Sequence, residues 1–432
     1  MYPKHLFLFV CKLLLAGAQL FAQTDQPPKW KLDFETEAEV RARQYTSSVG
    51  APFKQQFELL AQQRLSLRKG EKLALKVALN GSLNARHEDR SRLWLNEAYL
   101  TWRKGKFVTK VGQQTLRWGT LSGFSALDLL NRYDYYDLLD TDNERLGIWG
   151  ADVRWSLGSA TDLSLRVFPD RNRSRLHLFD NRWVRLPERL YTPDLPAEGV
   201  PFRNTAVIAT QTQNIPAVSL GLDTELGRFS TQFTAYYGPN DIPQTSIALQ
   251  ELTLTGAEYH LQQQYHHIGM GVAQLSTFLG DWNVSVEGAL VYSKRLGIAG
   301  ELTDDPYLFG SVGLDRLWLF DNPEQQFKLV AQSLWGHSLR GLDYGPTELD
   351  HVFHRTALLQ VDWRINYRWT ISWQHVQDWT AGGYYTRPEL RLRANDHWQF
   401  WLRADLLGGG EEHFFGYHQH NDRIALHLKL YL

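Results

Sequence analysis

Apolar and ionisable residues alternate along the stretch from Trp30 to Arg43. Every second position is apolar or neutral, and the positions between them carry charge: Lys31, Asp33, Glu35, Glu37, Glu39, Arg41 and Arg43. A period of two residues predicts a β-strand, because successive side chains point to opposite faces. Seven ionisable side chains on one face need water, so we expect this strand to separate an apolar environment from a wet space.

The same alternation recurs at residues 72–80, 357–366, 389–394 and 423–432. Segments of about ten residues with one apolar and one polar face are typical of the strands of outer-membrane barrels. The chain is therefore predicted to be all-β and to form a single transmembrane antiparallel β-barrel.

Two kinds of connection separate the expected strands. Eight are tight turns, around Lys69-Gly70, Lys104-Gly105, Gly158-Ser159, Gly227, Gly280, Asn322-Pro323, Asn366-Tyr367 and Asn395-Asp396. The others are longer and polar, with large ones at about 119–147, 170–216, 239–265 and 407–421. Outer-membrane barrels have short turns in the periplasm and long loops outside, so eight turns with both termini in the periplasm predict about 18 strands.

Aromatic residues lie within a few positions of each expected tight turn. They are Trp102, Phe107, Trp155, Phe229, Trp282, Phe327, Trp369 and Trp398. Amphipathic rings prefer the level of the lipid headgroups, so these residues are predicted to form an interfacial girdle.

The first 22 residues have the form of a secretory signal peptide. A basic start is followed by an apolar run from Leu6 to Leu15 and by small residues before an expected cut near Ala22. That run is too short to span a membrane, which takes about 20 apolar residues. We therefore expect residues 23–432 to form the barrel. A soluble β-sandwich, propeller or β-helix would also alternate, but the signal and a strand series that reaches Leu432 favour the membrane barrel.

Composition excludes several classes of function. The only cysteine, Cys11, lies in the expected signal, so the exported chain has no thiol for a disulfide, a nucleophile or a metal site. The formal net charge of −1 gives no electrostatic reason to expect nucleic acid as a partner. Mean hydropathy is −0.39, and no segment after the signal has the length and apolar character of a membrane helix.

Residues 93–150 carry a recognisable motif order. The strand Leu95–Trp102 is followed by Val111-Gly112-Gln113-Gln114, Arg117-Trp118-Gly119, Asp128, Asn131-Arg132 and Asp134. This order resembles a Gram-negative outer-membrane porin-like β-barrel family of unassigned function, and more distantly the barrels of the alginate-export type. The resemblance implies an outer-membrane channel or exporter. In that location we expect outer-membrane lipid and lipopolysaccharide as its surroundings.

The long connection at 119–147 combines many leucines and tyrosines with aspartates. Such a segment is too apolar to extend freely into water. We expect it to be partly helical, to fold into the barrel and to form a constriction, with its acids across the lumen from wall arginines. The alternative is that it packs over the outer rim.

The inward faces of the strands and this loop supply the candidate lumen residues. The pore-lining or constriction candidates are Asp33, Glu35, Glu37, Arg41, Arg64, Lys76, Arg103, Lys110, Arg117, Asp128, Asp134, Arg154, Arg364, Arg391 and Arg393. Rows of opposite charge in a narrow lumen focus the electric field and set ion preference. The alternative for each residue is that it pairs with a neighbour and only keeps the lumen wet.

Other clusters point to chemistry less directly. The loop 170–216, expected outside the cell, is rich in arginine. Arginine binds phosphate and carboxylate, so lipopolysaccharide or an anionic solute is a candidate partner; an exposed solvated loop is the simpler interpretation. Two clusters of histidines lack the spacing of a metal site. They are His260, His266 and His267, and His413, His418 and His420. No nucleophile elbow, phosphate loop or dinucleotide motif is present.

The sequence therefore predicts a porin-like channel for small polar or charged solutes, monomeric or trimeric, without catalysis, cofactor or metal. An 18-stranded barrel leaves an aqueous channel unless a loop obstructs it. Two alternatives are a barrel that binds or exports a surface polysaccharide and a barrel enzyme such as a lipase or deacylase. The enzyme needs a Ser and His pair at the lipid boundary, and the sequence offers none that is convincing.

Overall fold

The structure is a computed structural model of the whole chain. It describes residues 30–47, 54–85, 90–116, 118, 122–139, 145–169, 174–176, 181–183, 189–190, 200–210, 216–242, 244–253, 256–296, 302–341, 351–380 and 382–432. The expected signal peptide lies outside the described residues.

Eighteen strands form one antiparallel sheet. In chain order they are β1 (Lys31–Tyr45), β2 (Gln55–Lys69), β3 (Leu73–Asn84), β4 (Arg92–Lys104), β5 (Phe107–Gln114), β7 (Ile148–Ser156), β8 (Thr161–Phe168), β12 (Ala217–Leu226), β13 (Phe229–Pro239), β16 (His267–Leu279), β17 (Trp282–Tyr292), β20 (Tyr307–Leu319), β21 (Gln326–Ser338), β22 (Arg355–Arg364), β23 (Trp369–Asp378), β24 (Tyr384–Arg393), β25 (Trp398–Gly408) and β26 (Arg423–Tyr431).

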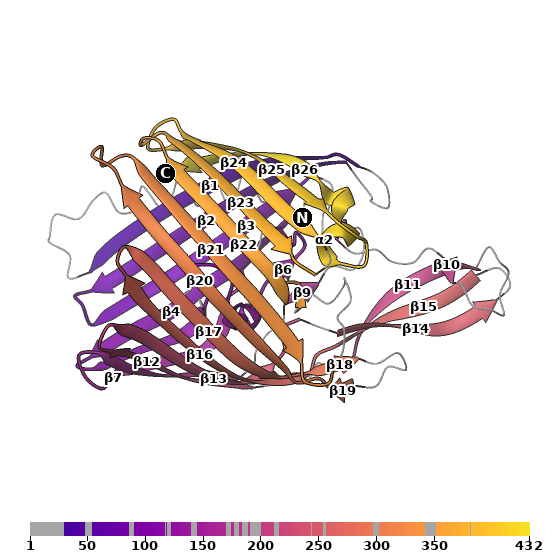
Figure 1. Cartoon of the computed structure of the whole chain (residues 1–432), viewed down its shortest axis with the longest axis horizontal. Coiled ribbons are helices and arrows are strands. Elements are labelled where there is room, and N and C mark those ends of the chain that lie inside the picture. Colours follow the sequence, from indigo (N-terminus) through magenta and orange to yellow (C-terminus); the bar gives the residue numbers. More distant parts are fainter. Residues whose placement is uncertain are drawn as a thin grey trace.

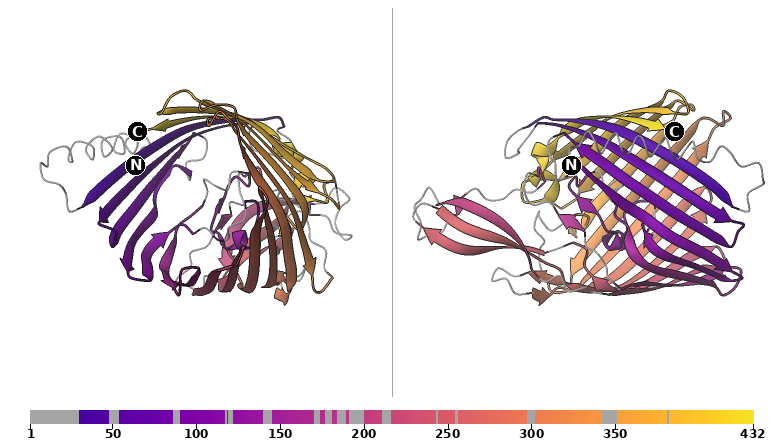
Figure 2. Two further views of the ribbon diagram at one scale, coloured as in Figure 1. Left: turned by 60° about the vertical axis from the view of Figure 1, so that its left-hand side comes forward. Right: turned by 180° about the vertical axis from the view of Figure 1, so that it is seen from behind.

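The sheet closes on itself because its first and last strands pair. β1 pairs with β26 from Glu37 opposite Tyr431 to Tyr45 opposite Arg423, and the strands surround a lumen (Figures 1 and 2). Closure removes every free edge of this sheet, as a spanning β-structure in lipid requires. The predicted all-β barrel and its count of 18 strands are confirmed. Among the described residues, no helix is long and apolar enough to cross a membrane.

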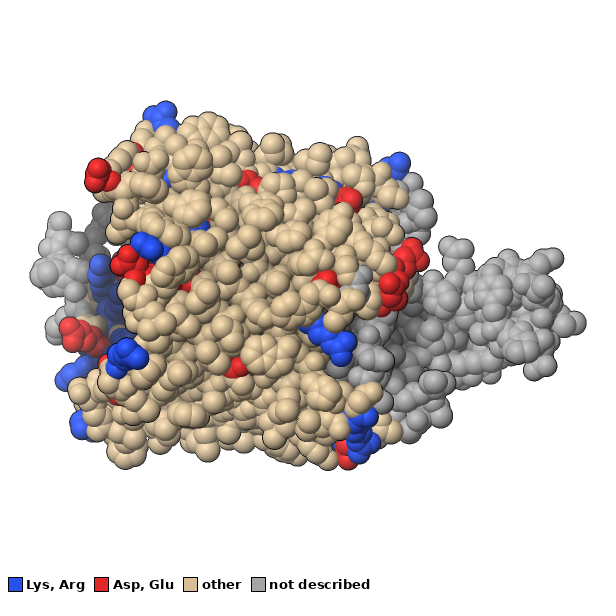
Figure 3. All heavy atoms as spheres, in the orientation of Figure 1, with Lys and Arg blue, Asp and Glu red and all other residues tan. Residues whose placement is uncertain are grey.

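The outer face of the barrel is apolar. Leu220 and Leu426 are each 52% exposed, although both lie inside strands and not at their ends. The face in Figure 3 is almost free of charge between its ends, where most of the charged groups gather. A surface of this kind is unfavourable in water and suits hydrocarbon. The expected location in an outer membrane agrees with this fold.

The eight predicted tight turns all connect neighbouring strands at one end of the barrel. Gly70, Gly105, Gly227 and Gly280 have φ between 56° and 64°, a conformation that glycine adopts at little cost. Aromatic rings gather beside these turns: Phe107 stacks on Trp155 with ring centroids 5.6 Å apart. Since Trp102 is also 46% exposed on the outer face, the expected aromatic girdle is present at this end.

The opposite end carries the long connections, which hold short elements of their own. They are η2 (Ala126–Leu130), β6 (Asp134–Tyr135), β9 (Arg175–Leu176), β10 (Arg189–Leu190), β11 (Val200–Thr210), β14 (Gln244–Thr253), β15 (Gly256–Gln264), β18 (Lys294–Leu296), β19 (Leu302–Asp304), α2 (Phe414–Tyr417) and η5 (Gln419–Asn421).

The connections at 170–216 and 239–265 contain regular structure, although their sequence predicts loops. β10, β11, β15 and β14 form a four-stranded sheet in which β11 and β15 run parallel. It extends beyond the long-loop end of the barrel (Figure 1). A parallel pair joins strands far apart in the sequence, and a local pattern does not predict such a pairing.

Candidate functional site

Residues 122–139, which we call the inward segment, cross the inside of the barrel. The first part of this segment, residues 122–130, is fixed to the wall far from β5 and β7. Phe124 exchanges two hydrogen bonds with Gln332 of β21: its N–H donates to Oε1 at 2.8 Å, and its carbonyl accepts from Nε2 at 2.6 Å. The Glu287 carboxylate of β17 accepts from the Ser125 hydroxyl at 2.5 Å and from the Ala126 N–H at 2.7 Å. The short helix η2 therefore begins against β17 and β21.

The helix η2 buries its apolar residues against the wall. Leu127 and Leu130 have no exposed surface. Inward-facing residues of the surrounding strands pack around them, namely Ile148, Phe168, Tyr236, Met270, Val272, Ala289, Val291, Phe309 and Leu334. The prediction of a partly helical loop that folds into the barrel is confirmed, and the long-loop half of the lumen is partly filled as a result.

The second part of this segment meets arginines of the near wall. Asp134 forms an ion pair with Arg92 of β4. The Asp137 carboxylate lies 2.6 Å from the Arg423 guanidinium and 3.6 Å from that of Arg43. We expected these acids to lie across the lumen from wall arginines. Instead, both aspartates are at most 3% exposed and contact the arginines directly. A desolvated charge must be paired closely, and the loop comes close enough for that.

Two further lumen candidates are engaged by neighbouring groups. Arg41 of β1 has no exposed surface, and its Nε lies 2.6 Å from the Glu39 carboxylate. Asp128 belongs to a helix cap: its carboxylate accepts from the Ser125 N–H at 2.9 Å and from the Asn131 amide at 3.1 Å. The alternation gives the direction of the Arg41 side chain correctly, but packing in the lumen excludes the water that the candidate role needs.

A β-bulge in β4 holds residues 145–147, which lie between the inward segment (122–139) and β7. The pairing of β3 with β4 shifts at Asn96, which is the extra residue. The Asn96 amide donates to the Arg145 carbonyl at 3.3 Å and accepts from the Gly147 N–H at 3.0 Å. Gly147 lies so close that a Cβ added to it would be 1.9 Å from the Asn96 carbonyl oxygen. The bulge thus places Arg145 inside the barrel.

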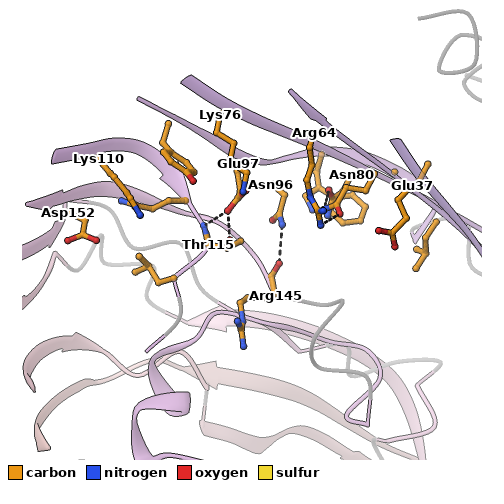
Figure 4. Close-up of a pocket in the computed structure, with 18 of the residues that line it drawn as sticks. Glu37, Arg64, Lys76, Asn80, Asn96, Glu97, Lys110, Thr115, Arg145 and Asp152 are labelled. Carbon is orange, nitrogen blue, oxygen red and sulfur yellow. Dashed lines mark hydrogen bonds and ion pairs between the residues drawn. The ribbon is translucent and has the colours of Figure 1, made fainter. Parts of the chain in front are cut away.

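Arg145 closes one side of a polar cavity of about 550 Å³. The rest of the lining comes from β1–β5, β7 and β8 (Figure 4). Its basic residues are Arg64, Lys76, Lys110, Arg145, Arg154 and Arg166, and its acids are Glu37, Glu39, Glu97 and Asp152. Five sequence candidates, Glu37, Arg64, Lys76, Lys110 and Arg154, therefore lie together in one place.

The acids of this polar cavity are neutralised by neighbours. The ion pairs join Glu37 to Lys429 at 2.7 Å, Glu39 to Arg41 at 2.6 Å, Glu97 to Lys76 at 2.7 Å and Asp152 to Arg166 at 3.6 Å. Within the part of the chain that the structure describes, no carboxylate lies at ion-pair distance from Lys110, Arg145 or Arg154. The cavity therefore offers uncompensated positive charge to a solute.

The remaining candidates lie toward the short-turn end. Asp33 and Glu35 line a second polar space of about 610 Å³, which Arg64 and Lys76 also line. Arg391 pairs with Glu389 at 2.5 Å.

The candidates nearest the turns contribute to neither polar space. Arg393 pairs with Asp396 in the turn at 3.1 Å, while Arg103 and Arg364 are exposed near the ends of their strands. These arginines lie at the rim of the barrel. Side chains alternate inward and outward up to the end of a strand, whereas the narrow part of the lumen lies deeper inside. Arg117 lies outside the described residues.

Sequence reasoning missed Arg145, Asn96 and Glu287. Arg145 lies between the acids of the long connection and β7, outside any alternating strand pattern. The local sequence therefore does not indicate in which direction its side chain points. Glu287 alternates with Val286 and Gly288 in β17 and was available as an inward residue. Its role as the anchor of η2 depends on a contact between residues more than 160 positions apart.

The histidine clusters have structural partners. His266 lies 3.0 Å from the Ser293 hydroxyl, and His418 packs edge-on against Trp183. In the described ranges, no group of three or more His, Cys, Asp or Glu residues is arranged to hold a metal ion. The side chain of His260 lies outside the described part.

One arginine of the 170–216 connection is not solvated as expected. Arg182 is 2% exposed, and its guanidinium donates to the Asn421 side chain at 3.1 Å and to the Ser47 and His420 carbonyls. Burial lowers the pKa of this guanidinium below its usual value. Arg182 therefore ties this connection to residues 420 and 421. The other six arginines of the connection either lie outside the described residues or have undescribed side chains.

No protein-family model matches the sequence, and no curated protein is significantly similar to it. Among solved structures, a BenF-like porin from Pseudomonas fluorescens Pf-5 superposes with a TM-score of 0.50 at 11% identity, covering 93% of this chain and 98% of that chain. Pseudomonas aeruginosa OccK2 (OpdF), solved in complex with glucuronate, gives 0.50 at 12% identity, covering 93% and 97%. The chain therefore has the fold of Gram-negative outer-membrane porins, and the expected porin-like architecture is confirmed.

Proposed function

We propose that this protein is an outer-membrane channel through which small polar solutes, anions above all, diffuse without catalysis. The observation that carries the proposal is the polar cavity beside the inward segment, where no carboxylate of the described residues lies within ion-pair distance of Lys110, Arg145 or Arg154. A lumen with low-dielectric walls focuses the field of such charges, so the local concentration of anions rises and that of cations falls.

Each unpaired cation contributes modestly. At about 10 Å in a water-like dielectric, a unit charge attracts an anion by about 0.4 kcal/mol, which is roughly a twofold change in local concentration. Salt screens this attraction over about 10 Å at 0.1 M, so the preference is expected to weaken at higher ionic strength.

The test is the reversal potential of the purified protein in planar bilayers under a potassium chloride gradient. We expect an anion preference that falls stepwise in Lys110→Gln, Arg145→Gln and Arg154→Gln. Arg316→Gln is the matched control, since Arg316 pairs with Asp281 at a turn, 2.7 Å away. A barrel that passes no current would overturn the proposal and would favour binding of a surface polysaccharide. A cation preference that stays the same in the three variants would show that Lys110, Arg145 and Arg154 do not set ion selectivity, and would overturn the proposed anion preference.

A further inference from the structure

A second cavity, of about 460 Å³, lies on the long-loop side of the inward segment. We call it the apolar cavity. Its wall is formed largely by hydrocarbon: Phe124 and Leu138 of the inward segment, Phe353 of the connection before β22, and Phe414 of α2. Its volume falls in the range of small-molecule sites, about 300–1,000 Å³.

The rings of this cavity are held in place and still exposed to it. Phe124 stacks on Phe353 with centroids 3.9 Å apart and planes 20° apart. Tyr385 stacks on Phe415, which in turn packs edge-on against Phe414. Phe124, Phe353 and Phe414 are only half-buried. Apolar surface in contact with water costs about 25 cal/mol per Å². An apolar group that enters the cavity and covers these rings therefore gains that free energy of burial.

The charged groups of the apolar cavity differ in what they can offer. Arg387 donates to the Asp405 carboxylate at 2.7 Å and to the Leu139 carbonyl, so it is already engaged. Asp128 is occupied by the η2 cap. Arg145 makes one weak bond, to the Tyr133 hydroxyl at 3.4 Å, and lies 5.7 Å from that ring. Its donors therefore remain for an anion.

Arg145 belongs to the linings of both cavities, the apolar one and the polar one. Aromatic surface lies beside this guanidinium in the apolar cavity, and Lys110 and Arg154 share the polar cavity with it. Apolar surface beside a cation complements a molecule with a hydrocarbon body and one anionic end. A small hydrophilic anion makes no use of the first surface, and a neutral apolar molecule makes no use of the second.

We infer that the apolar cavity is a binding site for amphipathic organic carboxylates, with the apolar body among Phe124, Phe353 and Phe414 and the carboxylate on Arg145. The inference rests on the proposed function and names its substrate class. Arg145 acts in it as the specificity-determining residue, since its planar fork binds a carboxylate through two donors.

Three probes separate the two halves of the site: 3-phenylpropanoate has body and charge, propanoate has the charge alone, and 3-phenyl-1-propanol has the body alone. Block of the chloride current in planar bilayers measures binding in the open channel. Titration calorimetry on the detergent-solubilised barrel measures binding whether or not the barrel conducts. We expect 3-phenylpropanoate to bind on the order of tenfold more tightly than either partial probe.

Two variants test the two halves of the site separately. Phe353→Ala is expected to weaken the binding of 3-phenylpropanoate on the order of tenfold and to leave the binding of propanoate unchanged. Arg145→Gln is expected to weaken both carboxylates and to spare the alcohol. The controls are Phe278→Ala, whose ring is 71% exposed beside a turn, and Arg316→Gln. Heat-modifiable migration on gels shows that each variant is folded.

The outcomes distinguish this inference from the proposed function. Equal affinity for 3-phenylpropanoate and propanoate in a barrel that conducts anions overturns the inference alone. A sealed barrel that binds 3-phenylpropanoate through Phe353 and Arg145 supports the site and overturns the channel. Loss of 3-phenylpropanoate binding in Phe278→Ala, equal to that in Phe353→Ala, would place the effect outside the cavity and overturn the inference.

Discussion

Replacing Glu287 by alanine tests whether the inward segment is held by a specific anchor. The Glu287 side chain is 1% exposed and accepts hydrogen bonds from the Ser125 hydroxyl at 2.5 Å and the Ala126 N–H at 2.7 Å; Gln274 also donates to it. A hydrogen bond to a carboxylate contributes about 1.5–3 kcal/mol, so the loss of the Ser125 and Ala126 bonds costs about 3–6 kcal/mol. That is enough to detach the start of η2.

The wall of the barrel is expected to survive this change. The backbone pairing of β17 with β16 and β20 does not involve the Glu287 side chain. Glu287→Ala should therefore keep its heat-modifiable migration, while single-channel recordings show a larger and noisier conductance, because the inward segment no longer stays against β17. Glu287→Gln keeps one acceptor oxygen and should lie between the two.

Glu225→Ala is the matched control, since Glu225 lies exposed at the short-turn end of β12. Recordings of folded Glu287→Ala that match the parent protein in conductance and noise would contradict the role of Glu287 as an anchor. Such a result would mean that Gln332 and the apolar packing of Leu127 suffice to hold the segment.

Three further changes test the energetics of the wall. Arg423→Met leaves Asp405 and Asp137 buried beside one fewer cation, and is expected to lower the free energy of unfolding in urea by about 3–5 kcal/mol; no change would mean that neighbouring arginines compensate. Leu220→Arg places a charge on the lipid face, where Leu220 is 52% exposed, and should cost about 2–4 kcal/mol in vesicle refolding titrations; a small cost would place this residue near an interface. Gly70→Ala, at φ 56°, should cost about 1 kcal/mol in the same assay, and an unchanged midpoint would contradict the turn geometry.

Much of the barrel could be derived from the sequence because its signals are local. Lipid on one face and water on the other impose a period of two on every strand, and the turns Lys69-Gly70 and Lys104-Gly105 carry residues suited to a reversal. The strand count followed from counting such turns. The inward direction of Lys76, Lys110 and Arg154 followed from the same alternation, and all three line the polar cavity.

The environment of each inward residue was decided only by the tertiary structure. Arg41 and Arg64 face the lumen by the same pattern, yet Arg41 is fully buried in ion pairs and Arg64 lines open space. Arg41 and Arg64 differ in the part of the lumen beside them and in how closely acidic partners approach them. Asp137 reaches Arg423 across 286 positions of sequence. Period and turn chemistry act between neighbours in the chain, whereas exposure and charge pairing inside a barrel arise between distant segments, so they appear only when the chain is folded.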